Sequence, residues 1–176
     1  MPGKREKKDR IRDILQRIAI FGGVADRALQ HLLTRAAPMT VEEEDFFFRE
    51  DDPAESMFVL VEGRVAVVKS IDGSEYELCR MEVGDCFGEL ELIDLRPRAA
   101  SVRALERCAA LEISASVLRE VYEIDETSFA IIHMNMGREV SRRLRKMDDD
   151  LLKVRARSAE ARDDGRFGKN PDLGIS

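Results

Sequence analysis

One passage of the chain, residues 87–104, carries residue types that could hold a phosphate and a sugar. It reads FGELELIDLRPRAASVRA. Gly88 opens a turn, and residues 89–93 can form one or two helical turns whose first backbone N–H groups have no partner inside the helix. Arg98 could fold back over that end and add a guanidinium with two parallel donors. Glu89 would repel a phosphate but could accept a hydrogen bond from a ribose hydroxyl. The passage therefore predicts a site for a phosphate joined to a ribose, and the alternative is an ordinary turn with a surface ion pair.

The residues before this passage fall into a helical part and a β-rich part. Residues 1–38 are predicted to be helical because apolar residues recur at helical spacing, namely Ile11, Ile14, Leu15 and Ile18. Gly22 and Gly23 interrupt this pattern, Asp26 is placed to cap a second helix, and Pro38 closes the segment. Residues 39–113 contain short runs of β-forming residues separated by turn residues, which predicts an antiparallel sandwich or barrel. Asp72-Gly73 is expected to form a hairpin turn.

The residues after the β-rich part are predicted to be helical over 114–157. Ser114 can cap a short helix, and a longer one is expected over 127–157. The apolar residues of the longer helix follow spacings of three and four, close to a heptad pattern: Phe129, Ile132, Met136, Val140, Leu144, Met147, Leu151 and Val154. We expect this stripe to be shared with a second copy in a homodimer, the alternative being that it packs along its own domain. Residues 158–176, rich in glycine, are predicted to be a disordered tail.

The composition excludes several classes of protein. The net charge of −6 disfavours a general nucleic-acid binder. Only two histidines are present, and no cluster of His and Cys has the spacing of metal ligands, so we expect no metal site, no cofactor and no catalytic residues. No targeting or membrane-spanning segment is visible, which predicts a cytoplasmic protein without membrane contact.

The passage 87–102 closely resembles the phosphate-binding cassette of cyclic nucleotide-binding domains. The matching residues are Phe87, Gly88, Glu89, Leu90, Leu92, Pro97, Arg98, Ala100, Ser101 and Val102. The similarity extends over roughly residues 14–150, including the stretch 49–63 and the approach to the cassette at 83–88. The resemblance implies a mainly β fold, an eight-stranded antiparallel β-roll with N-terminal helices and a long C-terminal helix.

The same resemblance implies a role for each residue of the site. Glu89 would bind a ribose hydroxyl and Arg98 the cyclic phosphate, and the backbone N–H groups of Leu90, Glu91 and Ala99 would surround the phosphate oxygens. Gly88 and Ser101 belong to the cassette, and Leu78, with Val65 or Val67, would line the base. Some family members carry a hydroxyl that favours guanine where this chain has Ala99, so we expect cyclic AMP, with cyclic GMP as the alternative.

Glu91 departs from the family pattern, because relatives carry a small residue at this position. Two like charges about 4 Å apart repel by on the order of 4 kcal/mol near a protein surface. Two hypotheses follow. The chain is a cyclic nucleotide sensor that acts on a separate partner protein, since no helix-turn-helix segment for DNA follows the long helix. Alternatively, Glu91 pairs with Arg98, and the chain is a dimerising adaptor that binds no nucleotide. Glu44 and Asp51 also replace two glycines that are usual in the family's turns.

Overall fold

The computed structural model describes the backbone of residues 4–164 and the side chains of residues 11–156. The first elements are α1 (Lys4–Arg17), a 3-10 helix (Ala19–Phe21) and α2 (Asp26–Arg35), as the apolar spacing predicted. The capping role expected for Asp26 was wrong. Ala25 occupies the N-cap of α2 and donates its N–H to Ser128 Oγ at 3.0 Å, so this end of the helix is tied to a distant segment. Pro38 does not end the helical part but lies inside the first strand.

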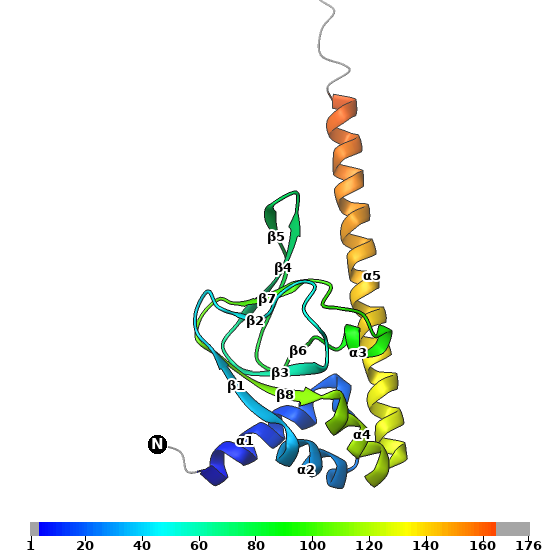
Figure 1. The fold of residues 1–176 in the computed structure, drawn as a ribbon. Helices are drawn as coiled ribbons and strands as arrows, with labels where there is room; N and C mark the ends of the chain where they lie inside the picture. The colour runs from blue at the N-terminus through cyan, green and yellow to red at the C-terminus, as the bar shows by residue number, and fades with distance from the viewer. Residues whose placement is uncertain (1–3, 165–176) are drawn as a thin grey trace, which may run out of the picture. The chain divides into compact units, whose positions relative to one another are not determined.

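Residues 37–114 form eight strands in two antiparallel four-stranded sheets. The strands are β1 (Ala37–Val41), β2 (Phe46–Phe48), β3 (Ser56–Glu62), β4 (Val65–Ile71), β5 (Ser74–Met81), β6 (Cys86–Phe87), β7 (Ser101–Ala104) and β8 (Cys108–Ser114). One sheet has the order β1-β8-β3-β6 and the other β2-β7-β4-β5. The predicted antiparallel β-roll with flanking helices is confirmed (Figure 1).

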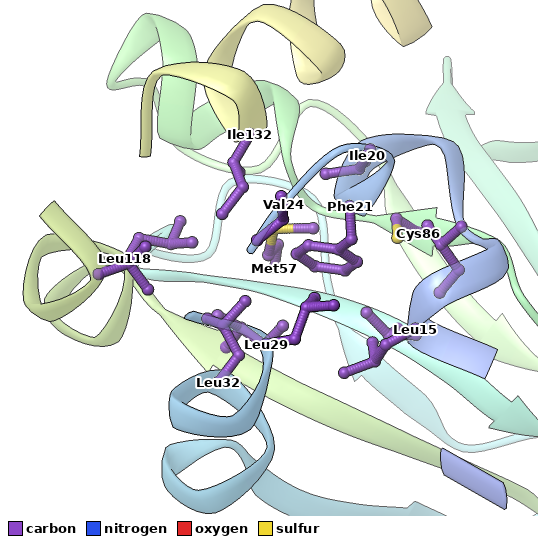
Figure 2. Close-up of a cluster of buried hydrophobic side chains, with 14 of the residues drawn as sticks. Leu15, Ile20, Phe21, Val24, Leu29, Leu32, Met57, Cys86, Leu118 and Ile132 are labelled. Atoms are coloured by element: carbon purple, nitrogen blue, oxygen red, sulfur yellow. The ribbon is translucent and has the colours of Figure 1, made fainter. Parts of the chain in front are cut away.

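Strand β3 separates two hydrophobic cores because successive side chains of a strand point to opposite faces. Met57 and Val59 face a core that the first sheet forms with the helices, and Phe58 and Leu60 face a core between the sheets. Figure 2 shows the first core, in which side chains from the N-terminal segment, β3, β6, α4 and α5 meet. The second core contains the tilted and stacked rings of Phe47, Phe48, Phe58 and Phe87.

The turns of the roll take up left-handed backbone geometry where the sequence suggested it. Asp72 (φ 52°) and Gly73 (φ 78°) connect β4 to β5 in a two-residue hairpin, as predicted. Glu44 (φ 66°) and Asp51 (φ 67°) adopt the same region. Glutamate is costlier there than aspartate, whose short side chain tolerates this geometry better.

The helices after the roll are α4 (Ala115–Ile124) and α5 (Glu126–Asp164). Ser114 Oγ accepts a hydrogen bond from the Val117 N–H, which confirms the predicted cap. Asn135 donates to the carbonyl oxygens of Ile20 and Gly22, and this contact holds the first part of α5 against the N-terminal segment. The residues up to Gly137 form one compact unit, and the helix from Arg138 onward forms a second.

The predicted boundary between helix and tail was too early. Helix α5 continues through residues 158–164, for which the sequence predicts a disordered tail. The rest of that segment, residues 165–176, lies outside the described residues. Among residues 4–164, no helix combines the length and hydrophobicity needed to cross a bilayer.

Candidate functional site

The segment between β6 and β7 contains a short helix, α3 (Leu90–Asp94), and begins at Gly88. Gly88 has a φ of 76°, a conformation that residues with a side chain rarely adopt. A Cβ atom at this position would lie 2.5 Å from Arg98 Nη1 and 3.3 Å from the Phe48 ring. Glycine therefore allows the Arg98 side chain to pass directly over the backbone of the turn.

Arg98 is held in place by groups from several strands and loops. Its side chain is 3% exposed; Nη1 donates to the Gly88 carbonyl oxygen at 2.9 Å, and Nη2 donates to the Ser56 carbonyl oxygen at 2.7 Å. The guanidinium lies 4.0 Å from the centre of the Phe48 ring. The Arg98 N–H also donates to the Asp52 carbonyl oxygen at 2.9 Å. The arginine is thus fixed in position by the β2–β3 loop and by β3.

Glu91 points toward Arg98. Its Oε1 accepts a hydrogen bond from the Ala99 N–H at 3.0 Å, and its Oε2 lies 3.4 Å from Arg98 Nη1. The residue is 6% exposed. Burial lowers the pKa of the Arg98 guanidinium, and the negative charge of Glu91 counteracts part of that effect. The Glu91 carboxylate therefore contacts two of the groups that the family resemblance assigns to the phosphate.

Glu89 is a second buried carboxylate of this passage, two residues before Glu91. Its side chain is fully buried, next to Gly88 and one residue before α3. We call the side chains of Glu89, Glu91 and Arg98, together with the Ala99 N–H, the cradle. The cradle contains one guanidinium, two buried carboxylates and a backbone donor, and Glu91 contacts both the guanidinium and the donor.

The remaining predicted site residues lie around the cradle. Ser101 Oγ accepts a hydrogen bond from the Glu50 N–H at 2.8 Å, so this hydroxyl ties β7 to the β2–β3 loop. Leu90 is 40% exposed. Leu78 is 55% exposed and is the extra residue of a β-bulge, because Val67 pairs with Cys79 and Val68 with Glu77. Its role at the base stays a prediction. Of the two valines considered beside it, Val65 is fully buried in the core between the sheets, whereas Val67 is only partly buried.

Sequence reasoning missed the residues that fix the cassette from a distance. Phe48 and the carbonyl oxygen of Ser56 both contact the guanidinium. Lys69 Nζ donates to the Ala99 carbonyl oxygen at 2.7 Å and forms an ion pair with Glu50. These residues lie on strands or loops that are remote from the cassette in sequence, and nothing in their local pattern marks them as its supports.

Comparison with known protein families identifies this arrangement. The family model described as the cyclic nucleotide-binding domain matches residues 38–125. This chain belongs to that family. The matched residues cover the β-roll and all residues of the cradle.

The relatives of this domain include regulators and channels. The chain is 28% identical over 141 residues to the CRP-like cAMP-activated global transcriptional regulator of Mycobacterium tuberculosis, and the match covers 79% of this chain and 61% of that protein. It is 26% identical over 152 residues to the cyclic nucleotide-gated channel alpha-4 of Mus musculus, covering 83% and 25% of the two chains. The chain thus spans less than two thirds of the length of either relative.

Solved structures of the family share the fold. A cyclic nucleotide-binding domain from Methylobacillus flagellatus superposes with a TM-score of 0.74 at 20% identity, covering 88% of this chain and 87% of that one. The regulatory domain of Toxoplasma gondii PKA, solved with cAMP, has a TM-score of 0.64 at 25% identity, covering 69% of this chain and 46% of that one. Within the described part of this chain, no group of three or more His, Cys, Asp or Glu residues could hold a metal ion.

Proposed function

We propose that this cyclic nucleotide-binding domain is a sensor whose ligand is cyclic AMP. The observation that carries the proposal is the buried Arg98 guanidinium, which Gly88 and Ser56 hold in the cassette three residues before a hydrogen-bonded Ser101 and in the same passage as the buried Glu89. Ligand binding there shifts the cassette between two states, and a separate partner protein responds to the change. We expect it to act in the cytoplasm, whose reducing conditions suit its three cysteines, none of which forms a disulfide bond.

The choice of cyclic AMP over cyclic GMP depends on residue 99. Alanine at this position offers no side-chain hydroxyl to the ligand. The phosphate must also displace Glu91, because its carboxylate already contacts Arg98 and the Ala99 N–H. If the carboxylate remained near the phosphate, repulsion on the order of 4 kcal/mol would oppose binding. Cyclic AMP therefore binds by exchange with Glu91, and the affinity is reduced accordingly.

The contact between Glu91 and Arg98 also favours a second candidate function. A carboxylate that replaces the phosphate permanently would keep the cassette in its ligand-like state without any nucleotide. The chain would then be an adaptor that holds a partner but senses no nucleotide.

Calorimetry on the nucleotide-free full chain separates the two functions. Cyclic AMP and cyclic GMP are titrated into the wild type, Glu91→Ala and Asp94→Ala, the last being a matched control because Asp94 is an exposed carboxylate on the same short helix. If the chain is a sensor, cyclic AMP gives measurable heat with the wild type. Arg98→Ala, titrated in the same way, should then bind cyclic AMP at least tenfold more weakly. An adaptor gives no heat with wild type at millimolar ligand and acquires binding in Glu91→Ala. No binding by any variant would exclude the sensor.

The distal part of α5 forms the homodimer contact of this proposal. Its apolar residues are spaced by three and four and are about half exposed or more: Leu144 58%, Met147 66%, Leu151 49% and Val154 58%. In a parallel, in-register pair of helices, Arg143 would face Asp148 of the second copy, and Asp150 would face Arg155. Such exposed pairs add little stability but favour this alignment. Apolar burial drives the association, at roughly 1.5 to 3 kcal/mol for each fully buried side chain.

Sedimentation velocity at tens of micromolar tests the dimer. The wild type is expected to sediment as a dimer, and the double variant Leu144→Glu, Met147→Glu as a monomer with unchanged β-sheet circular dichroism. Leu152→Glu is the control, because Leu152 is 62% exposed but lies outside the stripe. A monomeric wild type would disprove the dimer.

A further inference from the structure

The cation of the cradle, Arg98, already has a carboxylate partner before any ligand enters. Glu89, Glu91 and Arg98 are all at least nine-tenths buried, and they supply two carboxylates against one guanidinium. The charges of Glu112 on β8 and Asp52 in the β2–β3 loop also act on Arg98. The Arg98 guanidinium is therefore already paired with a carboxylate before any ligand enters.

This balance opposes an anionic ligand but not a neutral one. A cyclic phosphate brings a further negative charge into a buried region where screening by water and salt is weak. The Arg98 charge that would compensate it is already in contact with Glu91 at 3.4 Å. A ligand with hydroxyl groups in place of the phosphate adds no charge and leaves this contact intact.

We propose that the cradle takes ribonucleosides without a phosphate as a second class of ligand, with Glu91 in place of the phosphate. A carboxylate has about four acceptor positions, and Glu91 uses two of them in its contacts with the Ala99 N–H and Arg98. A ribose hydroxyl that would otherwise carry the phosphate donates to Glu91, and another donates to Glu89. The inference rests on the ligand-sensing part of the proposed function, because it uses the same ribose and base positions.

Both ligand classes enter the site by the same route. The carboxylates of Glu89 and Glu91 are buried, so the segment from Gly88 to Ala99 moves outward to admit either ligand. The position of Glu91 after entry decides the class. With the carboxylate on Arg98 the site takes a nucleoside, and with the carboxylate displaced it takes a cyclic nucleotide. Glu91 is thus a specificity-determining residue.

Calorimetry with adenosine and cyclic AMP on the full chain tests this inference. The wild type is expected to bind adenosine, and Glu91→Ala to bind it at least tenfold more weakly, since hydrogen bonds to a charged group are lost. Cyclic AMP is expected to bind Glu91→Ala at least tenfold more tightly than it binds the wild type. Glu91→Gln keeps an acceptor oxygen without the charge. Its affinity for each ligand should lie between those of the wild type and Glu91→Ala. Asp94→Ala should bind both ligands with the same affinity as the wild type.

The outcomes separate this inference from the proposed function. If cyclic AMP binds the wild type and adenosine binds no variant, the nucleoside inference is wrong and the sensor stands. If adenosine binds and cyclic AMP binds no variant, the nucleoside inference stands and the cyclic AMP assignment fails. Equal adenosine affinity in wild type and Glu91→Ala would also overturn the inference. Circular dichroism checks folding, and if Glu91→Ala does not fold, the comparison with Glu91→Gln decides by the same criteria.

Discussion

Replacing Glu91 by alanine should destabilise the ligand-free protein, because the substitution removes a carboxylate from a buried cluster. In the wild type this carboxylate lies 3.4 Å from Arg98 Nη1 and accepts a hydrogen bond from the Ala99 N–H at 3.0 Å. Both residues of the pair are more than nine-tenths buried. The variant leaves the guanidinium without this charge partner and the backbone N–H without its acceptor.

The expected loss is about 3 kcal/mol in the free energy of unfolding. Removing one partner of a buried ion pair typically costs about 3–5 kcal/mol, because the other charge stays buried. The 3.4 Å separation is long for a charge-assisted bond, which favours the low end of that range. A domain of this size has roughly 5–15 kcal/mol of stability in total, so the variant should still fold. Glu91→Gln keeps an acceptor for the Ala99 N–H and should lose about half as much.

Urea denaturation at pH 7, followed by circular dichroism, measures this loss. With a slope of about 2 kcal/mol per molar urea, the midpoint should fall by about 1.5 M for Glu91→Ala. The free energy of unfolding of the control Asp94→Ala should stay within about 0.5 kcal/mol of the wild-type value. Asp94 is exposed, and its carboxylate accepts a hydrogen bond from the Arg96 N–H at 3.3 Å. Millimolar cyclic AMP should restore part of the lost stability of Glu91→Ala by binding the folded state.

The reasoning would be refuted if Glu91→Ala and wild type had the same midpoint without ligand. That result would mean that Glu91 points away from Arg98 in solution. Both the exchange mechanism and the nucleoside inference would then lose their structural basis.

Three further predictions concern other contacts. Gly88→Ala should reduce cyclic AMP affinity at least tenfold, as measured by calorimetry, because the new Cβ would lie 2.5 Å from Arg98 Nη1; an unchanged affinity would show that Arg98 need not cross the turn. Asn135→Ala should cost about 1–3 kcal/mol in urea denaturation, since two carbonyl oxygens of the N-terminal segment lose their donor; a loss below about 0.5 kcal/mol would contradict this. A hydrogen bond from Arg35 lowers the pKa of Glu120 below its usual 4.5, so the ion pair stabilises the protein above that pH, and its contribution is lost as the pH falls through the lowered pKa. The stability difference between wild type and Glu120→Gln should therefore shrink from pH 7 to pH 3, and a constant difference would exclude this linkage.

The sequence by itself determined the order of elements and the place of the cassette. Short β-forming runs and apolar residues at helical spacing are local patterns, because one face of each strand or helix must be buried. The Asp72-Gly73 hairpin and the Ser114 cap were predictable for the same reason, since both depend on neighbouring residues. The cassette was recognisable because its polar residues lie within one contiguous passage.

Only the tertiary structure decided where the Glu91 carboxylate points. The sequence offered the contact with Arg98 only as one alternative, because a helix as short as α3 does not by itself select a rotamer. The choice depends on which partners the fold places nearby, and these include the Ser56 carbonyl oxygen, 42 residues before Arg98 in the chain, and the ring of Phe48. The N-cap of α2 shows the same limit, because the cap partner is Ser128, a residue 103 positions away from Ala25. Contacts between such distant residues arise when the sheets and helices pack, and the local sequence pattern carries no record of them.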